Sequence, residues 1–112
     1  MKLDFSELES GIRLIKLSGR LDLNGTYNVE VPFVRHCQGE NVRVIVDLSG
    51  VNYISSVGIP MLVNTAKSVM DRGGKFVLLS PPNNVKGVLE MVGVFHSIKV
   101  YNDLNEAIAE LG

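Results

Sequence analysis

The sequence predicts an α/β domain: a mixed, mostly parallel β-sheet of four to five strands with about four helices. After residue 40, short β-branched segments alternate with segments of helical apolar period, which is typical of strand–helix–strand units. In residues 2–19, apolar and polar side chains instead alternate with period two on either side of Gly11, which indicates a hairpin. An antiparallel hairpin beside parallel strands makes the sheet mixed. The 112 residues are enough for one domain, expected to span residues 1–112.

The N-terminal third of the sequence predicts two strands followed by a helix whose start is hard to place because the segment contains a proline. Residues 2–8 are expected to form an edge strand and residues 12–19 its partner, with Asn24-Gly25 marking a turn after the hairpin. Residues 26–39 have apolar side chains at helical spacing but contain Pro32, which costs ~3 kcal/mol or more inside a helix. The helix therefore either begins near Pro32 or is kinked there, and it is expected to end near Gly39.

The remaining elements alternate between strand and helix. Residues 42–48 form an almost continuous apolar run that predicts a central strand, ended by a turn at Ser49-Gly50. An amphipathic helix is expected over residues 57–71, with Met61 away from its apolar stripe and exposed. Strands at 75–80 and 97–101, a helix closed by Gly93 and a final helix capped by Asp103 complete the prediction.

Composition limits the classes of function. The net charge of −1 and the absence of a basic stripe argue against a nucleic-acid surface. The only cysteine, Cys37, cannot form an internal disulfide, and no signal peptide or apolar run of about 20 residues is visible, so a cytoplasmic protein without membrane insertion is expected. The sequence contains no ligand-spaced metal cluster, no phosphate-cradling loop and no set of acid, base and nucleophile, so neither a cofactor nor an enzyme is expected.

Two adjacent serines, Ser55 and Ser56, stand where a strand gives way to a helix. A serine oxygen at a helix start accepts a hydrogen bond from a free backbone N–H group and contributes ~1 kcal/mol, so one interpretation is structural capping. The other interpretation is modification, since a helix N-terminus also attracts anions and a phosphate on Ser56 would be well placed there. Such a phosphate would add about −1.5 to −2 charges to a nearly neutral surface.

Four segments together resemble the STAS domain family, in its branch of bacterial anti-sigma factor antagonists. They are LSGRLD at 17–22, VIVDLSGVNYISSVGI at 44–59, GGKFVLLSPP at 73–82 and LEMVGVFHSIKVY at 89–101, in matching order along nearly the whole chain. In that family a loop of the form aromatic-hydrophobic-Asp-Ser-Ser/Thr-Gly-Leu precedes the second helix, and its first serine is phosphorylated. The resemblance places Ser56 at this phosphoacceptor and Asp22 at an acidic residue near it.

The chain departs from that pattern at three positions. Ser55 replaces the aspartate, Val57 removes the second hydroxyl, and Pro60 stands where glycine or a polar residue is common. Losing the aspartate removes a negative charge from the helix start and a possible kinase contact. Val57 leaves Ser56 as the one matching acceptor, and Pro60 stiffens the first turn.

The resemblance implies a partner-switching regulator of transcription. Its partner would be an anti-sigma factor of the histidine-kinase-like ATPase type that is also a serine kinase. This kinase would phosphorylate Ser56, and the phosphorylated protein would no longer bind it. A serine phosphatase would then remove the phosphate and reset the protein. The alternative is a constitutive STAS subunit of a multiprotein complex such as a lipid-type ABC transporter, with Ser56 as a helix cap. A turn at Ser80-Pro81 is expected at the same end of the sheet as Ser56, as a second contact. The residues expected to touch the partner are Asp22, Asn24, Ser55, Ser56, Val57, Gly58, Pro60, Met61, Ser80 and Pro81.

Overall fold

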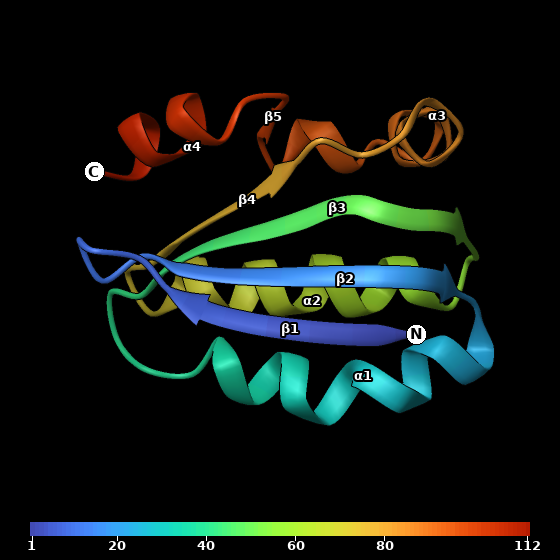
Figure 1. Ribbon diagram of the computed structural model, residues 1–112, viewed down its shortest axis with the longest axis horizontal. Helices are drawn as coiled ribbons and strands as arrows, with labels where there is room; N and C mark the ends of the chain where they lie inside the picture. Colours follow the sequence, from blue (N-terminus) through green and yellow to red (C-terminus); the bar gives the residue numbers. More distant parts are fainter.

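The computed structural model describes residues 1–112 and contains one five-stranded sheet in the order β1-β2-β3-β4-β5 (Figure 1). Strand β1 is antiparallel to β2, and the other neighbouring strands are parallel. The strands are β1 (Lys2–Glu7), β2 (Arg13–Leu21), β3 (Arg43–Ile54), β4 (Lys75–Leu79) and β5 (Val100–Tyr101). The helices are α1 (Leu23–His36), α2 (Gly58–Asp71), α3 (Asn83–Met91) and α4 (Leu104–Leu111), with a 3-10 turn at Val94–His96. The predicted mixed α/β class is confirmed.

Helices cover both faces of the sheet. The larger core cluster joins β2, β3 and β4 to α1, α2 and α3, and includes the fully buried Phe33 and Leu62. Ile45 points to the opposite face from its neighbours Val44 and Val46, because side chains alternate along a strand, and there it packs with α4 in a second cluster. No helix of the chain is long and apolar enough to cross a membrane.

Strand β3 is longer than predicted, and the expected turn at Ser49-Gly50 is wrong. The strand continues to Ile54, and its ladder with β2 contains two register shifts, so residues 49–50 belong to a bulged strand. A Cβ atom at Gly50 would lie 2.7 Å from Ser18 Oγ, which explains the glycine as close packing between strands. The bulges carry β3 past the end of β4, and this extension positions the loop that contains Ser56.

Helix α1 begins earlier than predicted, and the expected turn at Asn24-Gly25 is wrong. Asp22 is the N-cap, and its side chain accepts a hydrogen bond from Gly25 N, so both residues of the supposed turn lie in the first helical turn. The helix does not begin near Pro32, because it starts at Leu23 and continues through the proline, which leaves the alternative of a kink at Pro32 as a prediction.

Two arginines bind the C-terminal end of α1 and the loop that follows it. Arg13 donates to the carbonyl groups of His36 and Gln38, at 2.9 and 2.6 Å. Arg72 donates to the carbonyl groups of Cys37 and Gly39 at 2.6 and 2.9 Å. These bonds satisfy carbonyl groups that a helix end leaves without partners, and they join α1 to β2 and α2.

The other predicted elements differ only in detail. Helix α2 matches the predicted 57–71 closely, and Gly93 closes the α3 segment with a φ of 80°. The last strand is confined to Val100–Tyr101, although residues 97–101 were predicted. Met70 and Val92 lie at the ends of their helices and are 41% and 55% exposed.

Candidate functional site

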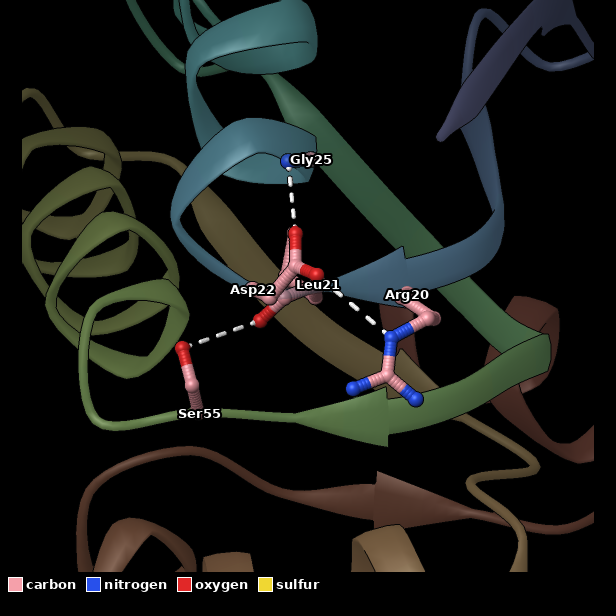
Figure 2. Close-up of polar contacts among 5 residues, drawn as sticks. All are labelled: Arg20, Leu21, Asp22, Gly25 and Ser55. Atoms are coloured by element: carbon pink, nitrogen blue, oxygen red, sulfur yellow. Dashed lines mark hydrogen bonds and ion pairs between the residues drawn. The ribbon is translucent and has the colours of Figure 1, made fainter.

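The candidate site forms where β2 and β3 end side by side. Leu21, the last residue of β2, is paired with Ile54, the last residue of β3. The loop that begins α1 and the loop that begins α2 therefore lie against each other, as Figure 2 shows. Parallel pairing and the length of β3 bring Asp22 and Ser55, which are far apart in the sequence, to one edge of the sheet.

Ser55 is the serine with the structural role. Its backbone N–H and its hydroxyl both donate to the carbonyl oxygen of Leu21, at 3.0 and 3.2 Å (Figure 2). The same hydroxyl oxygen accepts a hydrogen bond from Val57 N at 3.3 Å. The hydroxyl of Ser55 thus ties the start of α2 to the end of β2, and the capping interpretation applies to Ser55.

Ser56 is exposed and makes no side-chain hydrogen bond within the chain. It lies two residues before Gly58, the first residue of α2, whose first turn contains no acidic residue. The N-cap Val57 has no side chain that can satisfy the free N–H groups of this turn. The Ser56 hydroxyl is therefore free for another molecule, beside backbone groups that favour negative charge.

Asp22 forms a small charged cluster at the same edge. Its two carboxylate oxygens accept hydrogen bonds from Gly25 N at 2.9 Å and from Arg20 Nε at 3.4 Å (Figure 2). The bond from Gly25 N, followed by the contact with Arg20, lowers the pKa of the Asp22 carboxyl below its ordinary value of 3.8. The Arg20 guanidinium also lies 4.2 Å from the ring centroid of Tyr53, in a cation–π contact.

Two glycines allow the elements of the site to approach closely. A Cβ atom at Gly25 would lie 1.9 Å from the Arg20 carbonyl oxygen, and a Cβ atom at Gly58 would lie 2.6 Å from Leu21 Cγ. Both glycines are buried, and any side chain there would push a helix away from the end of β2. Gly58 is therefore a packing residue, although it was predicted to touch the partner.

A groove of about 430 Å³ runs between α1 and α2 and reaches the Ser56 loop. Val57 and Pro60 line its end next to Ser56, and Leu23 and Tyr27 line its α1 side. Met61 also lines the groove but is only 5% exposed, so its predicted exposure is wrong; the side chain turns toward the core cluster between the helices.

Ser80 and Pro81 follow β4 as predicted, and β4 is parallel to β3, but β3 runs further before it reaches the Ser56 loop. Strand β4 ends with Leu79 opposite Asp47, whereas β3 continues for seven more residues, which is roughly 20 Å of strand. The Ser80 hydroxyl donates to the carbonyl oxygen of Asn102 at 3.1 Å, and Pro81 is buried. The extension of β3 beyond Asp47 was not predicted.

Sequence reasoning missed three residues that support the site. Arg20 and Tyr53 are paired across β2 and β3, and one signal was available in LSGRLD, where the arginine precedes the acidic residue by two positions. Asn84 donates from Nδ2 to the carbonyl oxygen of Asn52 at 2.9 Å and so holds the start of α3 against the extension of β3. No local pattern predicts this contact, because it depends on the length of β3.

The chain belongs to the STAS domain family, whose model matches residues 6–107. Among curated relatives, a candidate anti-sigma factor antagonist of Thermotoga neapolitana is 35% identical over 69 residues, which is 62% of this chain and 61% of the relative. The chain therefore matches about three-fifths of that protein's length. The anti-sigma F factor antagonist of Paenibacillus polymyxa is 23% identical over 94% of this chain and 91% of its own.

Solved structures share the fold at low identity. An anti-sigma-factor antagonist (STAS) domain protein of Planctomyces limnophilus has a TM-score of 0.87 at 22% identity, covering 97% of each chain. The Bacillus cell fate determinant SpoIIAA in its phosphorylated form has a TM-score of 0.73 at 17% identity, covering 99% of this chain and 100% of that one. At these identities the likeness establishes the common fold alone.

Proposed function

We propose that this protein is an anti-sigma factor antagonist that is switched off by phosphorylation of Ser56. The single observation that carries the proposal is the free Ser56 hydroxyl, exposed and without a hydrogen bond at the start of α2. The adjacent Ser55 already caps the loop, so a modification of Ser56 breaks no hydrogen bond of the fold. Relatives named as anti-sigma factor antagonists support the class of function.

The surface around Ser56 suits a docked protein whose binding a phosphate would oppose. Val57 is 42% exposed, and with Pro60 it forms an apolar rim on the groove between α1 and α2. A partner seated on this rim would cover the Ser56 hydroxyl and exclude water. A dianion of about −1.5 to −2 charges there would have to be desolvated when the partner covers it. A loss of roughly 3 kcal/mol would weaken binding more than 100-fold.

The proposed partner is an anti-sigma factor of the histidine-kinase-like ATPase type that also acts as the serine kinase, with a serine phosphatase resetting the protein in the cytoplasm. Binding of the unphosphorylated form would release the sigma factor. In this scheme the protein is a substrate and a ligand, not an enzyme. The contact surface consists of residues that follow the ends of β2 and β3, in the Ser56 loop and in the first turns of α1 and α2, with the half-buried Asp22 and the exposed Asn24, Ser56, Val57 and Pro60 at its centre.

Incubation with the cognate kinase and ATP, followed by intact-mass measurement and site mapping, tests the proposal. We expect one added phosphate on Ser56 and none on the Ser56→Ala variant. Ser55→Ala is the matched control: it loses the bonds to Leu21 and Val57 but keeps the Ser56 hydroxyl, so it should still accept one phosphate. Phosphate on another residue would refute the assignment of the site. No phosphate at all would favour the constitutive STAS subunit, in which Ser56 is never modified.

A further inference from the structure

We propose that α1 is a self-association face, through which two copies of this chain pair as a short parallel coiled coil. The inference does not depend on the proposed function. It rests on the outward side of α1, where Tyr27, Val31 and Val34 are 72%, 63% and 40% exposed. Three large apolar side chains at successive turns of a 14-residue helix form an unpartnered stripe.

The spacing of this stripe is that of a heptad seam. Asn24, Tyr27, Val31 and Val34 follow one another at intervals of three, four and three residues, the a-d-a-d order of a two-stranded coiled coil. In parallel pairs, a single asparagine at an a position specifies the register and the oligomeric state. The residues that face the core, among them Val29 and Phe33, lie on the other side of the helix.

The charges beside the seam identify a second copy as the occupant. In this register Glu30 occupies a g position and Arg35 the following e position. In a parallel pair a g residue meets the e residue five positions later in the other helix, so Glu30 of each copy would meet Arg35 of the other. Both side chains are exposed, and neither belongs to the ion pairs within the chain, which are Lys2–Asp4, Arg20–Asp22 and Lys99–Glu110.

A surface hollow is lined by the residues of this seam. It has a volume of about 390 Å³ and is lined by Glu30, Val31, Val34, Arg35 and Gln38. The apolar floor and the two opposite charges at its sides are complementary to the same patch on a second copy, as a two-fold interface requires. With only two heptads available, the dimer should be weak and reversible.

Sedimentation velocity over about two orders of magnitude in protein concentration tests the dimer by mass action. The wild type should shift from monomer to dimer as concentration rises, and Val31→Lys should raise the dissociation constant by roughly tenfold or more. Because Val31 is exposed, this variant should remain folded, and its circular dichroism checks that. A wild type that stays monomeric throughout, or a dimer unaffected by Val31→Lys, overturns the proposal.

Charge reversal and cross-linking test the orientation. Glu30→Arg and Arg35→Glu should each weaken the dimer, whereas an equimolar mixture of the two variants should restore it, because every interhelical pair is then of opposite charge.

Cross-linking gives a separate test of the orientation. In a parallel pair, the cysteine of Val31→Cys faces the same residue of the other copy and should form an intermolecular disulfide on oxidation. The native Cys37 stays out of this reaction, because burial raises the pKa of its thiol to about 12. Met91→Cys, on an 85% exposed side chain away from α1, is the control. Equal cross-linking of the two cysteine variants, or no rescue by mixing, contradicts a parallel seam.

Discussion

At the scale of single residues, the two adjacent serines differ in the hydrogen bonds that their hydroxyl groups make. Ser55 donates to the Leu21 carbonyl oxygen and accepts from Val57 N, so its hydroxyl is already occupied. Ser56 follows immediately and is exposed with no bond. The capping interpretation thus applies to the Ser55 side chain, whereas the proposed phosphoacceptor is Ser56. The sequence places both serines at a helix start, but which hydroxyl turns inward depends on how β3 meets β2.

Asp22 provides a prediction that depends on pH. Its folded-state pKa lies below 3.8 because Gly25 N and Arg20 stabilise the carboxylate, so its contribution to stability is present above the unfolded pKa and is lost as the pH falls through the lowered folded value. Asp22→Ala should therefore lower the melting temperature at neutral pH, and the difference from wild type should shrink below pH 3.8. Thermal melts across this range measure the effect. A difference that grows as the pH falls would contradict the role of the carboxylate.

At the scale of elements, the errors in prediction share one physical cause. Asn24-Gly25 and Ser49-Gly50 have the local composition of turns, yet one pair starts α1 and the other lies within β3. In both cases the glycine is present because another segment approaches closely: the Arg20 carbonyl at Gly25, and Ser18 at Gly50. Such a close approach, whether from five residues away at Gly25 or from a neighbouring strand at Gly50, leaves no periodic signal in the sequence.

The close packing at Gly25 gives a prediction with a matched control. Gly25→Ala would place a Cβ atom 1.9 Å from the Arg20 carbonyl oxygen, so α1 must shift, at a cost of about 1–3 kcal/mol. Gly87 lies inside α3 with no atom within 4 Å of an added Cβ, so Gly87→Ala should stabilise the protein by roughly 0.5–1 kcal/mol. Urea denaturation of both variants measures the two changes. Equal effects of the same sign would show that packing at Gly25 does not control stability.

At the scale of the whole molecule, the periodicity of apolar residues was sufficient to predict the architecture. It was not sufficient to predict which residues lie together at the site. The alternation of strands and helices predicted the mixed sheet, because each amphipathic segment must bury its apolar face against the others. The length of β3, which extends seven residues beyond the end of β4, could not be predicted in the same way. The Ser56 loop therefore follows the end of the longest strand, beside the groove between α1 and α2.

The central claim is that an added dianion at position 56 is tolerated by the fold and rejected by the docked partner. The most direct test is calorimetric titration of the cognate anti-sigma factor with two forms of this protein, unmodified and carrying phosphoserine at position 56. We expect the phosphorylated form to bind more than about 100-fold more weakly, with an unchanged melting temperature because the Ser56 hydroxyl makes no bond in the fold. Equal affinities for the two forms, or a phosphorylated form that is itself unfolded, would contradict the account.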